Sequence, residues 1–269
     1  MMKKTLALLL AALMMCLAFA ACSSEPASSG TESDVEYIKE KGTLVVGITN
    51  FAPMDYLDEN GEWIGFDADM ARKVAEALGV EVEFIEIEWG NKLIELENKS
   101  VDCLWNGMTI TDEITNGAAA TNPYAKNAQV VVMTAENAAN YTTAESVAEL
   151  FVAVESGSAG EAAANDAGFA NLNSVTSQAD ALMEVAAGTS DACVIDLLMA
   201  GAMIGEGTSY PDLVITEIEL TEEDYGVGCR KGSDLVDFIN EQFVALYEDG
   251  TMMELAEEYG IAANIVPQS

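Results

Sequence analysis

Histidine is absent from all 269 residues, and basic residues are scarce. The chain carries 11 Lys and Arg against 46 Asp and Glu, which gives a formal net charge of −35, and segment 127–229 contains no Lys or Arg. These absences exclude histidine-based catalysis, the common zinc sites and binding to the backbone of a nucleic acid, which requires basic patches. We therefore expect no metal, no cofactor and no nucleic-acid partner. An anion bound by segment 127–229 would depend on backbone N–H groups and hydroxyls.

Cysteine is also scarce, with five residues in the chain. Cys16 lies in the apolar N-terminal run and Cys22 directly follows it. The remaining three, Cys103, Cys193 and Cys229, are odd in number and far apart. This spacing does not predict a disulfide framework. It favours free, buried thiols.

A long apolar run occurs at the N-terminus, "MMKKTLALLLAALMMCLAFAACSS". Two lysines followed by an apolar stretch predict an export signal over residues 1–21; the alternative is an anchor helix that stays attached. The residues before Cys22 resemble a bacterial lipobox, although Phe19 stands where a smaller aliphatic residue is commoner. Cleavage there would place a lipid on the sulfur of Cys22 and tether the protein to a membrane. The small, polar and acidic residues of 22–36 predict a flexible linker.

Short apolar runs then alternate with amphipathic patterns. Strands are predicted at 43–48, 81–87, 101–105, 128–133, 152–157, 191–196, 212–218 and 225–233. Helices are predicted at 66–79, 91–98, 142–151, 159–168, 177–188, from about 197, at 233–250 and at 251–260. This alternation predicts an α/β fold with a mostly parallel, covered sheet. Ligands bind such sheets at the carboxyl ends of strands, which is where the polar run after 101–105 falls.

Several motifs occur in a fixed order: "GTLVVGITNFAPMDYLDENGEWIGFDADMARKVAEALG", "NGMTITDE", "NPY", "SVAELFVAVESGSAGE", "GTSDACVID" and "YGVGCRKGSDLVDFINEQFVALYEDGT". Over about Tyr37 to Ile261 they resemble the extracytoplasmic solute-binding proteins of the polar amino-acid ABC-importer family. The resemblance implies a two-lobe, periplasmic-binding-protein-like α/β fold with a hinged interlobe cleft. It also implies a monomer without catalytic residues, which binds an amino acid or amino-acid-like polar solute and delivers it to a membrane permease.

The resemblance places the lobe boundaries as well. Lobe 1 is expected to be discontinuous, at 37–125 plus 223–269, and lobe 2 to span 126–222. The two crossings between the lobes would fall near 123–129 and 219–225. We keep these boundaries as the definition of lobe 1 and lobe 2 below.

Two aromatic residues occupy ligand-binding positions of the family. Phe51 and Trp89 would hold the body of the ligand between their rings, or a cation over a ring face. The alternative is ordinary packing. In the next motif Asn106, Gly107 and Thr109 match positions that hydrogen-bond the ligand. Their alternative is a capped turn leading into a helix, because Thr111 and the acidic pair after it form a good helix start.

Lobe 2 is expected to contribute two further ligand contacts. Ser158 falls in the loop that in the family donates to the ligand carboxylate from a helix N-terminus. Asp196 matches the carboxylate that pairs with the ligand ammonium group. For both residues the alternative is a role as a helix N-cap.

One position departs from the family pattern. Where the family has an arginine that binds the α-carboxylate of the ligand, this chain has Ile114, and an aliphatic side chain cannot replace a guanidinium. Either backbone N–H groups and hydroxyls hold the carboxylate, or the ligand lacks one; Lys92 and Lys126 are the nearest alternative cations. Asp196 without the arginine favours an amine-bearing or cationic ligand. Ile48, where some relatives place a carboxylate, counts against lysine, arginine or histidine.

Two other functions compete with transport. An extracytoplasmic sensor subunit would bind a ligand in the same way and dock on a signalling partner. A dehydratase-type enzyme on the same scaffold would need a general acid in the cleft, for which Glu155 or Asp196 would serve. The missing histidine and the missing arginine count against the enzyme.

Overall fold

The computed structural model describes residues 33–269, and no helix within this range is long and apolar enough to cross a membrane. The predicted signal peptide 1–21, the lipid anchor Cys22 and most of the predicted linker lie outside the described residues. Helix α2 (Asp34–Lys41) begins inside the range 22–36, so its first three residues are not linker as predicted. Ser33 caps this helix, accepting the N–H of Glu36 at 3.0 Å. A hydroxyl cap and acidic residues in the first turn stabilise a helix in this polar segment.

Nine of the strands in residues 33–269 form one sheet, in the order β4-β1-β5-β11-β7-β10-β8-β9, with β6 paired to β11. The strands are β1 (Thr43–Ile48), β4 (Glu81–Glu86), β5 (Cys103–Thr109), β6 (Ala119–Ala120), β7 (Ala125–Thr134), β8 (Phe151–Glu155), β9 (Asn171–Val175), β10 (Ala192–Asp196) and β11 (Leu213–Cys229). Pairing is parallel at both ends of the sheet and antiparallel around β7 and β11. The short strands β2 (Tyr56–Leu57) and β3 (Trp63–Ile64) form a separate hairpin. The mostly parallel sheet expected from the sequence is thus a mixed one.

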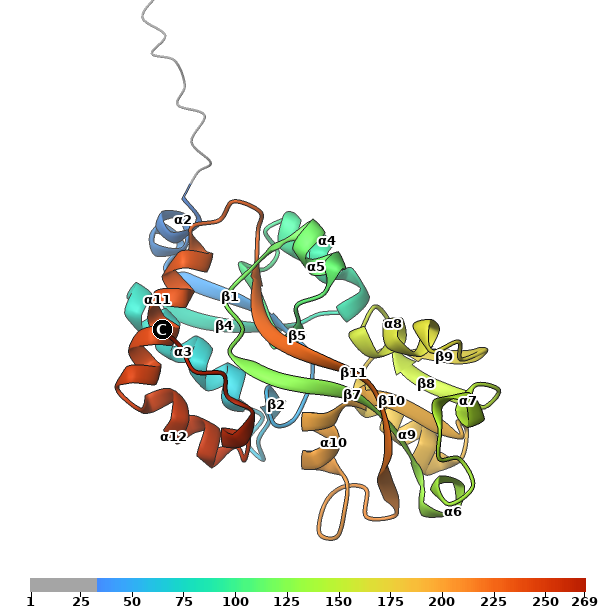
Figure 1. The fold of residues 1–269 in the computed structure, drawn as a ribbon. Coiled ribbons are helices and arrows are strands. Elements are labelled where there is room, and N and C mark those ends of the chain that lie inside the picture. Colours follow the sequence, from blue (N-terminus) through green and yellow to red (C-terminus); the bar gives the residue numbers. More distant parts are fainter. Residues whose placement is uncertain (1–32) are drawn as a thin grey trace, which may run out of the picture. The chain divides into compact units, whose positions relative to one another are not determined.

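Helices cover both ends of the sheet (Figure 1). In lobe 1 they are α2, α3 (Phe66–Leu78), α4 (Lys92–Glu97), α5 (Asp112–Gly117), α11 (Leu235–Glu248) and α12 (Thr251–Glu258). In lobe 2 they are α6 (Ala135–Ala138), α7 (Ala144–Val147), α8 (Ala159–Asp166), α9 (Gln178–Ala187) and α10 (Leu197–Met203). The 3-10 turns η1 (Trp89–Asn91) and η2 (Ala262–Asn264) complete the described elements. Cys103, Cys193 and Cys229 are buried in this core and free, which confirms the prediction for them.

Strands β7 and β11 run side by side from one lobe to the other (Figure 1). The register pairs Ala125 with Tyr225 at one end and Thr134 with Leu213 at the other. The predicted crossing segments are therefore neighbours in the sheet. The prediction of two separate strands at 212–218 and 225–233 is wrong, because β11 continues between them through two register shifts. The intervening polar residues resemble a loop in the sequence, but pairing with β7 keeps them extended.

Three further predictions differ from the structure. The helix predicted at 142–151 is reduced to α7, which Thr143 caps and which ends before β8 begins. Strand β9 was not predicted, because it is a polar edge strand without apolar alternation. Strand β5 does not end at residue 105 as predicted but continues through Thr109. The polar residues after "VDCLW" thus belong to the sheet.

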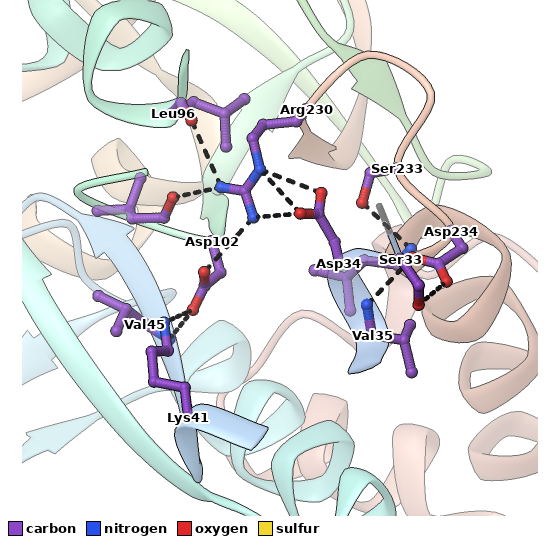
Figure 2. A network of polar contacts seen from close by, with 12 residues as sticks. Ser33, Asp34, Val35, Lys41, Val45, Leu96, Asp102, Arg230, Ser233 and Asp234 are labelled. Carbon is purple, nitrogen blue, oxygen red and sulfur yellow. Dashed lines mark hydrogen bonds and ion pairs between the residues drawn. The ribbon is translucent and has the colours of Figure 1, made fainter. Parts of the chain in front are cut away.

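An ion-pair network around Arg230 connects three parts of lobe 1 (Figure 2). The guanidinium lies 2.9 Å from a carboxylate oxygen of Asp34 in α2 and 3.5 Å from Asp102, which precedes β5. Asp102 also pairs with Lys41 Nζ at 2.6 Å and accepts the N–H of Val45 at 2.8 Å. Burial raises the pKa of Asp34, but the hydrogen bond and charge of Arg230 outweigh it and hold this pKa below its ordinary value. Here two buried carboxylates meet two cations.

Candidate ligand-binding cleft

A cleft of about 1020 Å³ opens between elements of the two lobes. All seven residues that the sequence singled out for the ligand line it: Phe51, Trp89, Asn106, Gly107, Thr109, Ser158 and Asp196. The first five come from a loop, the 3-10 turn η1 and strand β5 of lobe 1, and the last two follow or end strands of lobe 2. The volume suits a small ligand, since binding pockets range over roughly 300–1,000 Å³. The structure brings the predicted residues together, and their contact with a ligand stays a prediction.

The two aromatic side chains are buried at the wall of the cleft. The Phe51 ring meets Tyr225 edge-on, with ring centroids 6.5 Å apart and an interplanar angle of 83°. The Trp89 ring lies under Lys92, whose Nζ is 5.6 Å from the ring centroid. Both rings therefore pack against protein groups and still line the cleft. Packing and ligand contact are compatible at these positions.

Asn106 uses its side chain inside lobe 1. Its Oδ1 accepts the N–H of Thr49 at 2.9 Å and the hydroxyl of Thr49 at 2.7 Å. Its Nδ2 donates to Asp55 Oδ2 at 2.8 Å. The predicted helix start is confirmed at Thr111, which accepts the N–H of Ile114 at 3.2 Å, but Asn106 lies before it within β5 and fixes the loop that carries Phe51. The sequence did not indicate this, since the bonding partners are more than 50 residues away.

Gly107 is constrained by two neighbours. Its N–H donates to Asp67 Oδ2 at 2.6 Å. Its φ is +52°, and a Cβ atom would lie 2.5 Å from Cε1 of Phe51, so only glycine leaves room for the aromatic ring. Burial raises the pKa of Asp67 to about 7, and burial with the charge of Asp67 raises the pKa of Asp55 well above its ordinary range. This pair of carboxyls lies behind the cleft wall.

The side chains of Thr109 and Ser158 each make one hydrogen bond within residues 33–269. The Thr109 hydroxyl donates to Glu223 Oε2 on β11. The Ser158 Oγ accepts the N–H of Glu161 at 3.0 Å and so caps α8. The capping alternative for Ser158 is therefore met. Ser158 and Ala159, at the start of α8, both line the cleft.

Asp196 ends β10 and is 4% exposed. Its Oδ1 accepts the hydroxyl of Tyr225 at 2.6 Å and Nε2 of Gln129 at 3.0 Å, and also the amide of Asn127; its Oδ2 accepts the amide of Gln178. The residue stands at the N-cap position of α10, but its side chain makes no capping bond, so that alternative is not met. Burial and the charge of Glu223 raise its pKa to about 7, against these hydrogen bonds.

Glu155 is a cleft residue that the ligand set from the sequence did not include. It ends β8, lines the cleft and is 3% exposed. Its Oε1 accepts no hydrogen bond from any residue in the range 33–269. Burial and the charge of Asp196 raise its pKa to about 8, while Gln178 and Lys92 oppose this shift. The sequence signal was a carboxylate at the carboxyl end of a predicted strand.

Lys92 is the cation of the cleft. Its side chain is 4% exposed, and it is the one Lys or Arg among the cleft-lining residues of the described chain. Its Nζ donates to the carbonyl of Gly157 in lobe 2 at 2.8 Å and lies 3.3 Å from Oε2 of Glu113. Ile114, next to Glu113, is 1% exposed and packs in an apolar cluster with Trp89. Lys126, the other alternative, pairs with Asp224 at 3.8 Å and does not line this cleft.

The backbones of the two lobes are in contact beside Lys92. Gly157 has a φ of +73°, and a Cβ on it would lie 2.6 Å from the Cα of Gly90. Gly90 belongs to η1 in lobe 1, and Gly157 to the loop before α8 in lobe 2. Two glycines therefore allow backbone to meet backbone at this edge of the cleft.

Two α/β lobes joined by paired strands, with a polar and aromatic cleft between them, define a two-lobe binding protein of the periplasmic type. Residues 44–262 match the family model for bacterial extracellular solute-binding proteins, family 3. The chain belongs to this family, whose members act outside the cytoplasm.

Relatives with established ligands cover most of the chain. The L-cystine-binding protein TcyJ of Escherichia coli (strain K12) is 25% identical over 235 residues, which is 86% of this chain and 88% of TcyJ. A mutant of ArgBP from T. maritima has a TM-score of 0.79 and 32% identity, covering 84% of this chain and 99% of that one. A substrate-binding protein from Streptococcus pneumoniae with bound histidine has a TM-score of 0.76 and 29% identity, covering 85% of this chain and 96% of that one.

A relative with a different activity matches a shorter stretch. The cyclohexadienyl dehydratase of Pseudomonas aeruginosa is 30% identical over 133 residues, about half of each chain (49% and 48%). The family and the longer matches are binding proteins, which points to binding as the function.

Proposed function

We propose that this chain is the substrate-binding receptor of an ABC importer, and that it binds an amino acid or amino-acid-like solute between its lobes. The observation that carries the proposal is the single cleft in which all seven predicted ligand residues meet. TcyJ is named for L-cystine, and ArgBP from T. maritima is known in an arginine-bound form, which supports an amino-acid ligand.

The ligand ammonium group belongs at Asp196 in this proposal. The carboxyl lies in the cleft wall, and its four donors from the protein are all neutral. A cation would therefore be the first full positive charge to bond to it, and hydrogen bonds between charged groups are the stronger kind. Phe51 and Trp89 would enclose the hydrocarbon part of the ligand. Asn106, Gly107 and Thr109 would contribute through the atoms that their internal bonds leave free.

The ligand carboxylate belongs near Lys92 and the start of α8. Lys92 bonds to one residue beside Ile114 and to one residue beside Ser158, so its ammonium lies between the position of the missing arginine and the lobe-2 loop. An ammonium is a point charge and does not bind a carboxylate in two places as a guanidinium does. The Ser158 hydroxyl and the backbone N–H groups at the start of α8 would supply the remaining donors.

The same proposal covers the location of the protein. The sequence before residue 33 supports a cleaved signal, a lipid on Cys22 and a short linker, so the receptor would work as a monomer tethered outside the membrane near its permease. Replacing Cys22 with Ala should move the protein from the membrane fraction to the soluble fraction. An unchanged membrane fraction would contradict the anchor.

Two alternatives remain to be separated by experiment. A sensor subunit would bind the same ligand but would depend on a signalling partner and not on a permease. Two observations favour an enzyme. The dehydratase matches half of the chain, and Glu155, with its raised pKa, could act as a general acid in the cleft. An enzyme would convert its ligand to a product of different mass, which a receptor leaves unchanged.

A ligand screen tests the proposal directly. The protein without residues 1–22 is heated with single amino acids, amines, betaines and dicarboxylic acids, and the melting temperature is measured. A ligand at 100 times its Kd adds about 2.7 kcal/mol to the free energy of unfolding, which is a clear shift. Stabilisation by an amino acid, recovered intact by mass spectrometry, is the expected result. Stabilisation only by acids without an amino group would contradict it.

A further inference from the structure

Glu155 has acceptor capacity that the protein does not use. The residue is 3% exposed at the carboxyl end of β8, yet its Oε1 has no donor among residues 33–269. Buried polar atoms in native proteins are nearly always hydrogen-bonded, and each exception calls for an explanation. Asp196 on the neighbouring strand β10 has four donors in the same environment. The two carboxyls of the cleft are therefore not equivalent.

The charges around Glu155 do not compensate it. Asp196 from β10 and Asp180 from α9 repel its negative charge, and Lys92 from α4 attracts it. The Lys92 ammonium, however, is bonded to the Gly157 carbonyl and lies beside Glu113. Eight carboxylates line the cleft against this one cation within the described range. The cleft thus has a large excess of carboxyl groups over cations, and Glu155, the most deeply buried of these carboxyls, has an oxygen without a donor among residues 33–269.

From these observations we propose that Glu155 determines the specificity of the cleft by binding a second cationic group of the ligand, separate from the ammonium group held by Asp196. The ligand class is then an amino acid whose side chain carries an ammonium or guanidinium group. This inference rests on the proposed function and deepens it. It means that lobe 2 selects the ligand by the charge of its side chain.

With Glu155 in this role, Ile48 no longer counts against a basic ligand. A carboxylate at this position in some relatives would come from the end of β1 in lobe 1, and its absence counted against a basic ligand. Glu155 supplies a carboxylate to the same cleft from β8 in lobe 2. A ligand with two cationic groups would then contact Asp196 and Glu155 on adjacent strands, while its carboxylate faces Lys92.

The test uses two pairs of probes that differ in the side-chain charge: L-arginine with L-citrulline, and L-lysine with L-norleucine. Affinities are measured by calorimetry for the wild-type protein, for Glu155→Gln and for Glu222→Gln. Glu222 is an exposed cleft-lining carboxylate, so its variant removes the same charge without removing a buried group. We expect the wild type to prefer the cationic member of a pair at least tenfold, Glu155→Gln to reduce this preference to about threefold or less, and Glu222→Gln to leave it within twofold.

A second measurement does not depend on any variant. At pH 7 the raised pKa keeps most of the Glu155 carboxyl protonated in the free protein. A cationic side chain that binds there displaces this proton, so calorimetry in two buffers of different ionisation enthalpy should show more proton release for L-arginine than for L-citrulline. The α-ammonium group is common to both probes and cancels in the comparison.

The outcomes separate the inference from the proposed function. Equal affinity of the wild type for both members of each pair, with equal proton release, would overturn the role of Glu155 and leave an amino-acid receptor. A preference that survives Glu155→Gln would overturn it as well. If the protein binds none of the four probes and no other amino acid in the screen, the proposed function is overturned and the inference with it. If it binds only other amino acids, the inference alone is overturned.

Discussion

Two groups of buried carboxylates in this molecule differ in their partners. In the Arg230 network, Asp34 and Asp102 meet the cations of Arg230 and Lys41 (Figure 2). In the cleft, Asp196 meets four neutral donors, and Glu155 leaves an oxygen without a donor among residues 33–269. The pKa of Asp34 is accordingly lowered, whereas those of Asp196 and Glu155 are raised to about 7 and about 8.

The difference separates a structural site from a binding site. A carboxylate that is buried to hold elements together has its compensating charge within the chain, because an unpaired buried charge is costly. A carboxylate that is buried to bind a cation must lack that compensation until the ligand arrives. Burial alone does not distinguish the two cases. A missing cationic partner distinguishes them only for a carboxyl group that also lines the cleft, because Asp55 and Asp67 are buried behind the cleft wall without an ion pair to a cation in the described part of the chain.

The largest effect is expected from breaking the compensated group. Arg230→Leu leaves Asp34 and Asp102 without the guanidinium, and removing one partner of a buried ion pair costs about 3–5 kcal/mol. Arg230 is 12% exposed, so solvent replaces little of the lost interaction. Urea denaturation should show this decrease in the free energy of unfolding. Lys73→Leu is the control, since its pair with Glu76 is exposed, and it should cost less than about 1 kcal/mol. Equal effects of the two changes would contradict the comparison.

A smaller effect, on binding instead of folding, is expected at Asp196. Asp196→Asn keeps the size of the side chain but removes the carboxylate that we propose binds the ligand ammonium group. We expect the affinity for the ligand found in the screen to fall about 100-fold, which is about 2.7 kcal/mol. The melting temperature of the free protein should change by only a few degrees. Asp166→Asn, at an exposed position of the cleft, serves as the control. Loss of folding with retained affinity would assign Asp196 to the structural class.

The smallest effect is expected for Glu155→Gln, which should raise the free energy of unfolding and not lower it. The pKa of Glu155 is about 8 when folded, against an ordinary value of 4.5, so its contribution to stability is fully present below about pH 4.5 and is lost as the pH rises towards 8. Glu155→Gln cannot ionise and should therefore become more stable than the wild type over this range. We expect a gain of about 1–2 kcal/mol at pH 8, below the full pKa difference because water can enter the cleft.

The matched change in the compensated group completes this test. Asp102→Asn is the same replacement of an acid by its amide, but it removes half of two ion pairs and should destabilise the protein at both pH 5 and pH 8. Urea denaturation of both variants at the two pH values gives the comparison. A loss of stability for Glu155→Gln at pH 8 would show that an unseen partner compensates this carboxyl.

The fold could largely be read from local sequence patterns. Strand β1 matches its predicted bounds because an apolar run defines it, and α3 ends where Gly79 provides a left-handed C-cap. The continuity of β11 could not be read in this way. Its polar middle is held by pairing with β7, some 90 residues earlier in the chain, and local propensity contains no information on that pairing.

The sequence predicted which residues line the candidate site but not the hydrogen bonds that they make. The family motifs identified seven of the residues that line the cleft. They did not show that Asn106 bonds within lobe 1, because Thr49 and Asp55 lie in another segment. Nor could the sequence distinguish Glu155 from Asp196, since both end buried strands. The distinction depends on donors from β7, α9 and β11 that bond to Asp196 and leave Oε1 of Glu155 without a donor.

The contact between Gly90 and Gly157 affects the residence time of a bound ligand as well as its affinity. These glycines and the Lys92 bond to the Gly157 carbonyl close one edge of the cleft, so a ligand held between the lobes leaves through this edge only after the contact separates. Tighter closure there lengthens the residence time of the bound solute. A receptor that must release its cargo to a partner therefore works best when this edge is held by one lysine bond and backbone contact, and not by a large interlocking surface.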